Sequence, residues 1–471
     1  MKVLYVTSEA LPFAATGGLG DVAGSLPHAL RKRLVGARIV MPLYEQIPEE
    51  LRENMKFLTS ISVPVSWRRQ YCGIFEARCN NVIYYLLDNQ YYFKRQGLYG
   101  HYDDAERFAF FSRAAIEILP FVEFKPDVII SNDWQSGLVP IYYSQFYANA
   151  EGFSGIKTVF TIHNISYQGC YGMEILGDVF GLPLSAQSLM EHNGDINIMK
   201  GAIESANAVT TVSPTYANEL LDPWYAHGLD TILRERSWKM RGILNGIDYD
   251  LYNPETDTNV FKNYTEKTFK SGKKKNKNML RERLELPQRD DVPVIGMITR
   301  LVEHKGLELI MQVLDQILTS DIQFVILGSG DWKYESALKT FIDRYPDKFR
   351  IVTGFIPELS RKIYAGADML LMPSKSEPCG LAQMIALRYG TIPIVRETGG
   401  LKDTVIDAGG ENGNGFTFKT FDAYDMLDAL NRALGGFSDK KSWNELVLHA
   451  MQCDNSWSKS ANELIRLLKN L

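Results

Sequence analysis

The sequence predicts an α/β protein with two doubly wound domains. The chain has 471 residues, which is more than one hydrophobic core usually supports. Short runs of Val, Ile and Leu alternate with segments of helical periodicity, the pattern of a parallel sheet with helices on both faces. This alternation lapses between about 252 and 278 and then begins again. We therefore expect domains over 1–250 and 251–450, and a C-terminal helix over 451–471 that packs back on the first domain.

The first half of the chain contains several expected strands and two marked helix starts. The strands are short apolar runs, most of which end in polar residues or glycine, at 3–7, 37–41, 128–131, 158–162, 208–212 and 242–244. After the first strand, apolar residues recur every fourth position from 22 to 34 and predict an amphipathic helix. Pro27 predicts a kink or a division of this helix, and Gly36 a cap at its C-terminus. Ser213 before Pro214 predicts an N-cap and another helix.

The second half begins after the segment that lacks this alternation. The segment 252–278 is rich in Asn, Thr, Lys and Gly and ends in the lysine-rich run 271–277. The run predicts a solvated loop or face, with contact to an anionic ligand as the alternative. A second doubly wound domain is expected beyond it, with strands at 292–298, 324–327, 350–352, 369–372 and 392–395.

Composition excludes several classes of protein. Hydrophobic residues make up 45% of the chain and charged residues 23%, so neither a disordered nor a membrane-spanning protein is expected. The 51 Lys and Arg against 56 Asp and Glu give a net charge of −5, which argues against a nucleic-acid partner. The 5 cysteines are scattered and indicate a reducing compartment. No targeting segment follows Met1, so a cytoplasmic location is expected.

The sequence also argues against common cofactors. No G-x-G-x-x-G motif follows the first strand, so a nicotinamide nucleotide is not expected. The histidines and cysteines lack the spacing of zinc ligands. Asp248-Tyr249-Asp250 matches a D-x-D pattern that can hold Mg²⁺, but such triplets are common by chance. We therefore expect neither a metal nor a cofactor.

Two strand-to-loop junctions have residues suited to a diphosphate. Thr16, Gly17 and Gly18 open a helix after the first strand, where bare glycine amides can approach an anion. After a strand of the second domain, Arg300 offers a planar fork to phosphate oxygens and Lys305 adds a point charge. Domains of this kind bind ligands at the carboxyl ends of their strands. The pair of junctions therefore predicts a ligand cleft between the domains.

Further polar motifs follow other expected strands. They are Asn132-Asp133-Trp134-Gln135, Thr161-Ile162-His163-Asn164, Asn245-Gly246-Ile247-Asp248 and Ser374-Lys375-Ser376-Glu377-Pro378-Cys379-Gly380-Leu381. His163 alone is compatible with a structural histidine, but its place at a strand end beside Asn164 favours a functional role. The carboxylate of Glu377 can accept hydrogen bonds from sugar hydroxyls, while the amides that open the next helix hold phosphate.

Taken in order, these motifs are similar to those of bacterial glycogen synthases and the catalytic core of starch synthases. The similarity covers essentially the whole chain, including residues 1–21 and Thr398-Gly399-Gly400-Leu401, and the motif Glu377-Pro378-Cys379-Gly380-Leu381 is specific. The resemblance implies two Rossmann-like domains facing across a deep cleft, the GT-B type. It also implies transfer of glucose from ADP-glucose to the non-reducing 4-hydroxyl of glycogen or another α-1,4-glucan, with retention of configuration.

Carried over by position, the resemblance implies roles for individual residues. Arg300 and Lys305 would neutralise the leaving diphosphate, and Glu377 would hold glucose hydroxyls. His163 and Asp133 complete the expected catalytic set. The expected substrate-binding residues are Glu9, Ala15, Thr16, Gly17, Gly18, Asp21, Asn164, Asn245, Phe355, Cys379, Gly380, Leu381 and Thr398, with Phe355 as the aromatic that stacks on adenine.

The chain departs from the family pattern at one position. Family members usually carry lysine directly before Thr-Gly-Gly, and here this position is Ala15. Loss of a charged hydrogen bond to a ligand costs about 1.5–3 kcal/mol. The departure therefore bears on turnover and on donor preference and leaves a weakly active or acceptor-shifted enzyme as an alternative, with Lys375 as the candidate substitute cation. Two further alternatives stay open at this point. They are a pyridoxal-phosphate-dependent phosphorylase of similar shape and a glucan-binding protein without activity.

Overall fold

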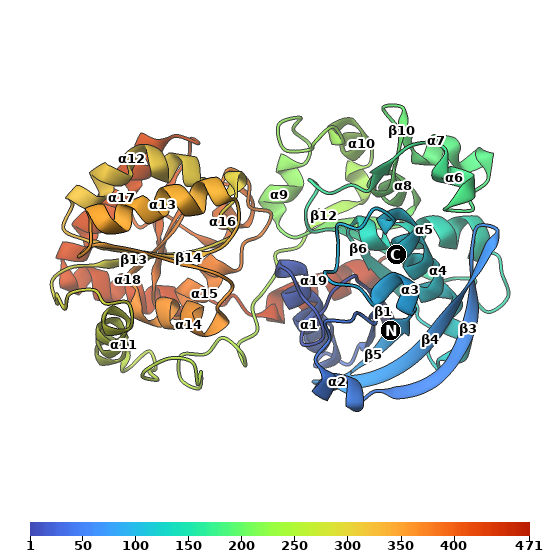
Figure 1. The fold of residues 1–471 in the computed structure, drawn as a ribbon, viewed down its shortest axis with the longest axis horizontal. Helices are drawn as coiled ribbons and strands as arrows, with labels where there is room; N and C mark the ends of the chain where they lie inside the picture. Colours follow the sequence, from blue (N-terminus) through green and yellow to red (C-terminus); the bar gives the residue numbers. More distant parts are fainter. The chain divides into compact units, whose positions relative to one another are not determined.

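The structure is a computed structural model that describes residues 1–471, and these form two compact units (Figure 1). Unit 1 comprises Met1–Asn245 and Trp457–Leu471, and unit 2 comprises Gly246–Ser456. The α/β class with two domains is confirmed. None of the helices combines the length and the apolar character that a membrane span requires.

Unit 1 contains a sheet of 9 strands in the order β12-β11-β7-β6-β1-β2-β5-β4-β3. The strands are β1 (Lys2–Val6), β2 (Gly36–Pro42), β3 (Lys56–Val65), β4 (Arg68–Cys79), β5 (Val82–Asp88), β6 (Val128–Asn132), β7 (Lys157–Ile162), β11 (Ala208–Thr211) and β12 (Met240–Gly242). From β12 to β5 the pairing is parallel, whereas β4 pairs antiparallel with both β5 and β3. The sequence did not predict β3, β4 and β5. In β3 and β4, exposed polar residues interrupt the apolar runs by which the other strands were found.

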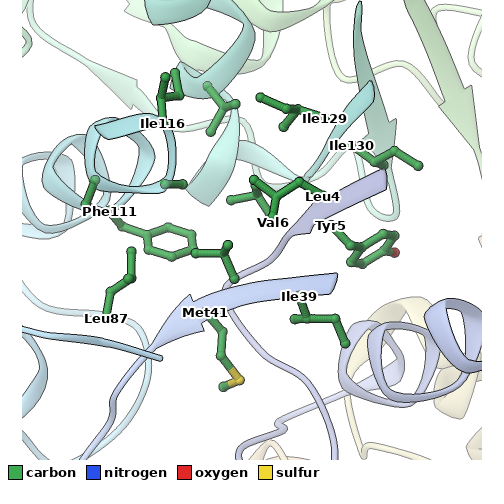
Figure 2. Packing of buried hydrophobic residues seen from close by; sticks show 14 of the residues in the cluster. Leu4, Tyr5, Val6, Ile39, Met41, Leu87, Phe111, Ile116, Ile129 and Ile130 are labelled. Atoms are coloured by element: carbon green, nitrogen blue, oxygen red, sulfur yellow. The ribbon is translucent and has the colours of Figure 1, made fainter. Parts of the chain in front are cut away.

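Helices cover both faces of this sheet. On one face, Leu4 and Val6 of β1 point toward Phe111 and Ile116 of α4 (Asp104–Glu117), whereas Tyr5 points to the other side (Figure 2). That other side is covered by α1 (Gly18–Arg31) and α19 (Trp457–Lys469). Smaller helices of the unit include α2 (Glu49–Glu53), α3 (Gln90–Phe93), α5 (Leu138–Tyr142), α6 (Ile175–Asp178), α7 (Gln187–Met190), α8 (Ile198–Ser205), α9 (Pro214–Glu219) and α10 (Asp230–Glu235).

Local expectations for the helices of unit 1 had mixed outcomes. The Ser213 side chain accepts the Tyr216 amide at 3.1 Å and caps α9, as predicted. The expected division of the first helix at Pro27 is wrong, because α1 is continuous and its apolar side is buried. The expected cap at Gly36 is also wrong. Leu34 is the left-handed residue after the helix, with a φ of 63°, and Gly36 already begins β2.

The C-terminal helix α19 belongs to the core of unit 1. Trp457 and Leu464 are buried in the same apolar cluster as α1. Arg33, just beyond α1, donates from Nε to Asn462 Oδ1 at 2.7 Å, and the Ser460 hydroxyl donates to the carbonyl oxygen of Leu244. The chain therefore leaves unit 1 after Asn245 and returns to it at Trp457.

Unit 2 contains a parallel sheet of 6 strands in the order β15-β14-β13-β16-β17-β18. The strands are β13 (Val294–Ile298), β14 (Gln323–Gly328), β15 (Phe349–Thr353), β16 (Met369–Met372), β17 (Ile392–Arg396) and β18 (Phe416–Phe418), and only β18 was not predicted. The helices include α11 (Phe269–Arg283), α12 (Leu307–Thr319), α13 (Trp332–Arg344), α14 (Pro357–Gly366), α15 (Ala382–Arg388), α16 (Gly399–Thr404), α17 (Ala423–Ser438) and α18 (Lys440–Gln452).

The lysine-rich run 271–277, predicted as a solvated loop or face, is part of a helix and is exposed on one side only. It lies within α11, where Gly272, Lys273, Asn276 and Lys277 are buried. A methyl group at Gly272 would overlap the ring of Tyr264, so glycine permits close packing at this point. The helix therefore uses lysine on its buried side as well as on its exposed side.

Lys273 has a buried amino group surrounded by hydrogen-bond acceptors. Its Nζ lies within hydrogen-bond distance of the Tyr364, Ala365 and Tyr389 carbonyl oxygens at 3.4, 3.2 and 3.1 Å, and of the Thr391 hydroxyl at 2.8 Å. Burial lowers the pKa of Lys273 to about 7. The side chain of Lys273 therefore links the C-terminal ends of α14 and α15.

We predict that Lys273→Met destabilises unit 2. The substitution leaves several buried carbonyl oxygens without a donor, which should lower the free energy of unfolding by about 3 kcal/mol or more. Urea denaturation followed by fluorescence measures this change. The control is Lys274→Met, because Lys274 is exposed and pairs with Asp290 at the surface. Equal stability of the two variants would contradict a structural role for the buried ammonium.

Candidate functional site

The strand order of unit 2 brings several predicted residues to one edge of its sheet. β13, β16 and β17 are adjacent and parallel, so their carboxyl ends lie together. Arg300 and Lys305 follow β13, Glu377 follows β16, and Thr398 follows β17. Residues from three distant parts of the sequence therefore form one group.

Lys305 and Glu377 form a largely buried ion pair at this edge. Lys305 Nζ lies 2.6 Å from Glu377 Oε2, and the Ser374 hydroxyl donates to the same oxygen at 2.9 Å. Burial acts to raise the pKa of Glu377, but Lys305 and the two hydrogen bonds outweigh it and hold the pKa below its usual value. Glu377 is therefore ionised at neutral pH, and its second oxygen is left to accept hydrogen bonds.

Two basic side chains flank this pair. Arg300 is exposed at the end of β13. Burial, together with the nearby charges of Lys305 and Arg300, lowers the pKa of His304 to about 4, so His304 is neutral at pH 7. Arg300, Lys305 and Glu377 together carry a net positive charge, which suits a diphosphate.

Close backbone packing sets the position of Glu377. Gly399 has a φ of 45°, and a methyl group there would overlap the Glu377 carbonyl oxygen. The Gly400 amide donates to the carbonyl oxygens of Glu377 and Pro378, both at 3.2 Å. Thr398 is buried immediately before these glycines. The loop after β17 therefore clamps the loop after β16.

The remainder of the loop after β16 is held by α15. Gly380 has a φ of 71°, which favours glycine. Gln383 Nε2 donates to the carbonyl oxygens of Cys379 and Gly380 at 3.0 and 2.9 Å. Leu381 precedes the helix, and the Cys379 side chain is buried. The carbonyl groups of this loop thus point into the protein.

Phe355 lies at the outer part of the same edge. It follows β15, and its side chain is 91% exposed. The amide of the preceding residue, Gly354, donates to the Gly328 carbonyl oxygen at 3.1 Å. The ring is therefore presented to solvent from an anchored backbone, which suits stacking on a planar ligand.

Unit 1 forms a second group at the carboxyl edge of its own sheet. Asp133 follows β6, and its backbone has a φ of 52°. Its Oδ1 accepts the amides of His163 and Asn164 at 2.7 and 3.3 Å. Asn132 donates from Nδ2 to the Val6 carbonyl oxygen, which directs its Oδ1 to His163 Nε2 at 2.8 Å. His163 Nε2 is therefore the donor, and Nδ1 is left as an acceptor.

Glu9 is a buried carboxyl group near this cluster. Its Oε2 accepts the Thr16 amide at 2.5 Å and the Thr16 hydroxyl at 2.9 Å. Burial raises the pKa of Glu9 to about 7, and the charge of Asp21 adds to the increase. Burial likewise raises the pKa of Asp133 to about 7 and lowers that of His163 to about 3. This edge therefore holds neutral groups or groups that titrate near pH 7.

The glycine-rich loop of unit 1 opens α1 as predicted. Gly17 precedes the helix, Gly18 begins it, and both are exposed. Ala15 is also exposed, and its methyl group lies so close to Gly20 that a Cβ at position 20 would overlap it. Glycine at position 20 therefore accommodates the side chain at position 15.

Asn245 and His163 line a pocket between the sheet and its covering helices. Thr161, Thr210 and Trp457 also contribute to its wall. The hydroxyl groups of Thr161 and Thr210 lie 2.8 Å apart and are hydrogen-bonded. Trp457, the first residue of α19, thus lies behind the predicted site residues of unit 1.

The residue-by-residue prediction missed Asn132, Ser374 and His304 as partners of site residues. Each lies next to or within a motif that was recognised, so proximity in sequence was the available signal. The carboxylate of Asp248, the first residue of the D-x-D triplet, accepts the amides of Asp250 and Leu251 at 2.8 and 3.3 Å. It closes a turn.

Known proteins resemble this chain over its whole length. Residues 2–235 match the family model described as starch synthase catalytic domain, and residues 279–445 match that of glycosyl transferases group 1. Glycogen synthase of Alkaliphilus metalliredigens is 45% identical and aligns over 100% of both chains. Glycogen synthase of Clostridium acetobutylicum is 48% identical over 98% of each chain.

Two solved structures share its fold. The catalytic domain of starch synthase IV from Arabidopsis thaliana bound to ADP and acarbose has a TM-score of 0.93 and 35% identity, over 99% of this chain and 98% of that chain. Sucrose-phosphate synthase from Thermosynechococcus elongatus has a TM-score of 0.63 over 100% of this chain and 98% of that chain, at 18% identity. The latter likeness shows the fold alone.

We predict that Glu9→Gln stabilises the protein above pH 7. The raised pKa means that the fold favours the protonated carboxyl group. The contribution of this group to the free energy of unfolding is therefore complete below about pH 4 and is lost as the pH rises to about 7. Glutamine avoids this loss and keeps an acceptor for Thr16. Thermal unfolding should show a gain at pH 8 that shrinks at pH 5, whereas the exposed control Glu53→Gln should show none. A gain independent of pH would contradict the assignment.

Proposed function

We propose, since this chain belongs to the starch synthase catalytic domain family, that it is a glycogen synthase. It transfers glucose from ADP-glucose to the non-reducing 4-hydroxyl of an α-1,4-glucan, with retention of configuration. The match to glycogen synthases over the whole chain supports this activity, and ADP in the starch synthase IV structure supports the donor. The predicted GT-B fold is confirmed by the same comparison. The observation that carries the mechanism is the Lys305–Glu377 ion pair at the sheet edge that also carries Arg300.

Unit 2 supplies the charges that the reaction needs. The bond between the anomeric carbon and the diphosphate oxygen breaks, and its electron pair passes to ADP. Negative charge grows on the diphosphate, so preset cations lower the barrier. Arg300 can bind phosphate oxygens through its fork, and Lys305 has further protons to donate besides the one toward Glu377. Glu377 accepts hydrogen bonds from the glucose hydroxyls and orients the sugar.

Retention of configuration follows without a carboxylate nucleophile. The oxygen of the acceptor 4-hydroxyl forms the new bond on the face from which the diphosphate leaves. Its proton passes to an oxygen of the departing diphosphate. Atoms and charge balance in this step, and the products are ADP and a glucan longer by one glucose.

Unit 1 contributes neutral hydrogen-bonding groups. His163 carries its proton on Nε2, toward Asn132, so Nδ1 can accept a hydrogen bond from a sugar hydroxyl. Asp133 orders the loop at His163 by accepting hydrogen bonds from the backbone amides of His163 and Asn164. Glu9 can hold acceptor hydroxyls as a carboxyl group that titrates near pH 7. These assignments rest on the geometry of the residues together with the family resemblance.

A donor and acceptor assay tests the function directly. The purified protein is incubated with glycogen and either ADP-glucose or UDP-glucose, and the released nucleoside diphosphate is measured. We expect release that depends on both ADP-glucose and glycogen, with ADP-glucose preferred. No release from either donor would instead favour the glucan-binding protein without activity.

We predict that Arg300→Ala and Lys305→Ala each lower kcat by about two to three orders of magnitude. Each substitution removes a cation from the charge that develops in the transition state. Steady-state kinetics measures the loss, and circular dichroism checks the fold. Lys339→Ala is the control, because Lys339 is an exposed cation of the same unit, in the middle of α13 rather than at its start. Turnover near that of the wild type in either variant would remove that cation from the mechanism.

We predict that Ala15→Lys raises kcat/KM for ADP-glucose by up to about a hundredfold, the worth of a charge-assisted hydrogen bond. Ala15 is exposed, so a lysine side chain can extend into solvent from this position. The conservative control is Ala15→Met, which adds length without charge. An unchanged or lower kcat/KM would show that the site already supplies this charge, and Lys375 would be the next cation to replace.

A further inference from the structure

An exposed tryptophan is fixed in place at the tip of the β3–β4 hairpin. Trp67 is 75% exposed, and its indole N–H donates to Asp178 Oδ1 at 2.9 Å. The guanidinium group of Arg68 lies over the ring, 4.9 Å from its centroid. With its polar edge bonded and one face covered, the ring presents its other face to solvent in a defined orientation.

The backbone below Trp67 is anchored as well. The Ser66 hydroxyl donates to the Gly177 carbonyl oxygen at 2.6 Å. Gly181 has a φ of 63°, and a Cβ there would lie 2.9 Å from Ser66 Cα. Arg68 Nη2 donates to Glu106 Oε2 at 3.0 Å and to the Asp178 carbonyl oxygen at 3.3 Å. The hairpin tip and the segment around α6 therefore form one continuous surface.

The hairpin tip lies on the reactive edge of the unit 1 sheet. β3 runs in the same direction as β1, because β4 is antiparallel to both β3 and β5, and β5 is parallel to β2. Asp88, the last residue of β5, pairs with Gly73, so residues 65–72 of the hairpin project beyond the carboxyl end of β5. Trp67 thus stands on the edge that carries Glu9 and Asp133, toward its outer end.

We propose that Trp67, with Asp178 and Arg68 at its rim, is an accessory binding site for an α-1,4-glucan chain. One face of a glucose ring is lined by C–H groups and packs on an aromatic face, while its hydroxyls bind charged groups at the rim. Asp178 Oδ2 and the Nη1 protons of Arg68 are suited to those hydroxyls, since Nη2 already donates to Glu106 and to the Asp178 carbonyl oxygen. A single aromatic ring bordered by charges fits a sugar better than a protein, whose interfaces need a larger core of excluded water.

The accessory site would act by local concentration. A glycogen particle carries many chains, so a second contact holds it near the acceptor site and raises its apparent affinity without a change in chemistry. A short oligosaccharide gains nothing from this contact. The accessory site rests on the proposed synthase activity. Kinetics with a short acceptor report the synthase activity alone, whereas kinetics with glycogen also report the accessory site.

The test compares Trp67→Ala with Trp238→Ala in the full-length chain. Trp238 is a matched control in unit 1, with 70% exposure. For Trp67→Ala we expect the glycogen concentration at half-maximal rate to rise about three- to tenfold, with kcat and the maltotriose kinetics unchanged. In native gels that contain glycogen but no ADP-glucose, glycogen should retard the Trp67→Ala variant less than the wild type, and the apparent affinity should fall by a similar factor. Trp238→Ala should match the wild type in both measurements.

A second variant guards against an indirect effect on the hairpin. Asp178→Ala keeps the ring but removes its hydrogen bond and a rim oxygen, so a smaller change of the same sign is expected. The accessory site is overturned if Trp67→Ala and Trp238→Ala have equal half-saturation for glycogen and equal retardation. Lack of activity with both glycogen and maltotriose in the wild type would instead overturn the proposed function.

Discussion

The ion pair between Lys305 and Glu377 is the interaction on which the candidate site of unit 2 depends. A buried carboxylate is costly without a partner, and Lys305 with the Ser374 hydroxyl provides one. The pair forms only because β13 and β16 are neighbours, and because Gly399 lets the next loop approach the backbone of Glu377. Gly306 makes a similar close approach to Pro373, where a methyl group would overlap the carbonyl oxygen. The charges of the site are therefore set by backbone contacts between loops.

The two units hold electrostatically different groups. Unit 2 presents Arg300 and Lys305 and keeps Glu377 ionised, so it suits the anionic part of a sugar nucleotide. The edge of unit 1 has no comparable cation among its site residues, and burial there favours the neutral forms of Glu9 and His163. Neutral hydrogen-bonding groups suit sugar hydroxyls. This division of chemistry agrees with a reaction in which a diphosphate leaves and a hydroxyl group attacks.

Much of the fold and of the candidate site was predictable, for a specific reason. Strands buried on both faces read as continuous apolar runs, so most of the parallel strands were found even where their ends shifted by a residue or two, whereas β5 and β18 were missed. Ligands of such sheets bind after the carboxyl ends of strands. That rule selected Arg300, Glu377 and His163 from single motifs. The strands β3 and β4 were missed because they are partly exposed, and their pattern is interrupted by polar residues.

By itself, the sequence determined the α/β class, the repeated domain pattern and the residue types of the site, because these depend on local periodicity and on short motifs. Only the tertiary structure decided which residues became partners. The lysine-rich run 271–277 looked solvated, yet Lys273 is buried because carbonyl groups of α14 and a later turn converge on its ammonium. Trp67 acquired a fixed orientation from Asp178, which lies 111 residues away in the sequence. Such contacts are set by how distant segments pack, and neither composition nor spacing encodes them locally.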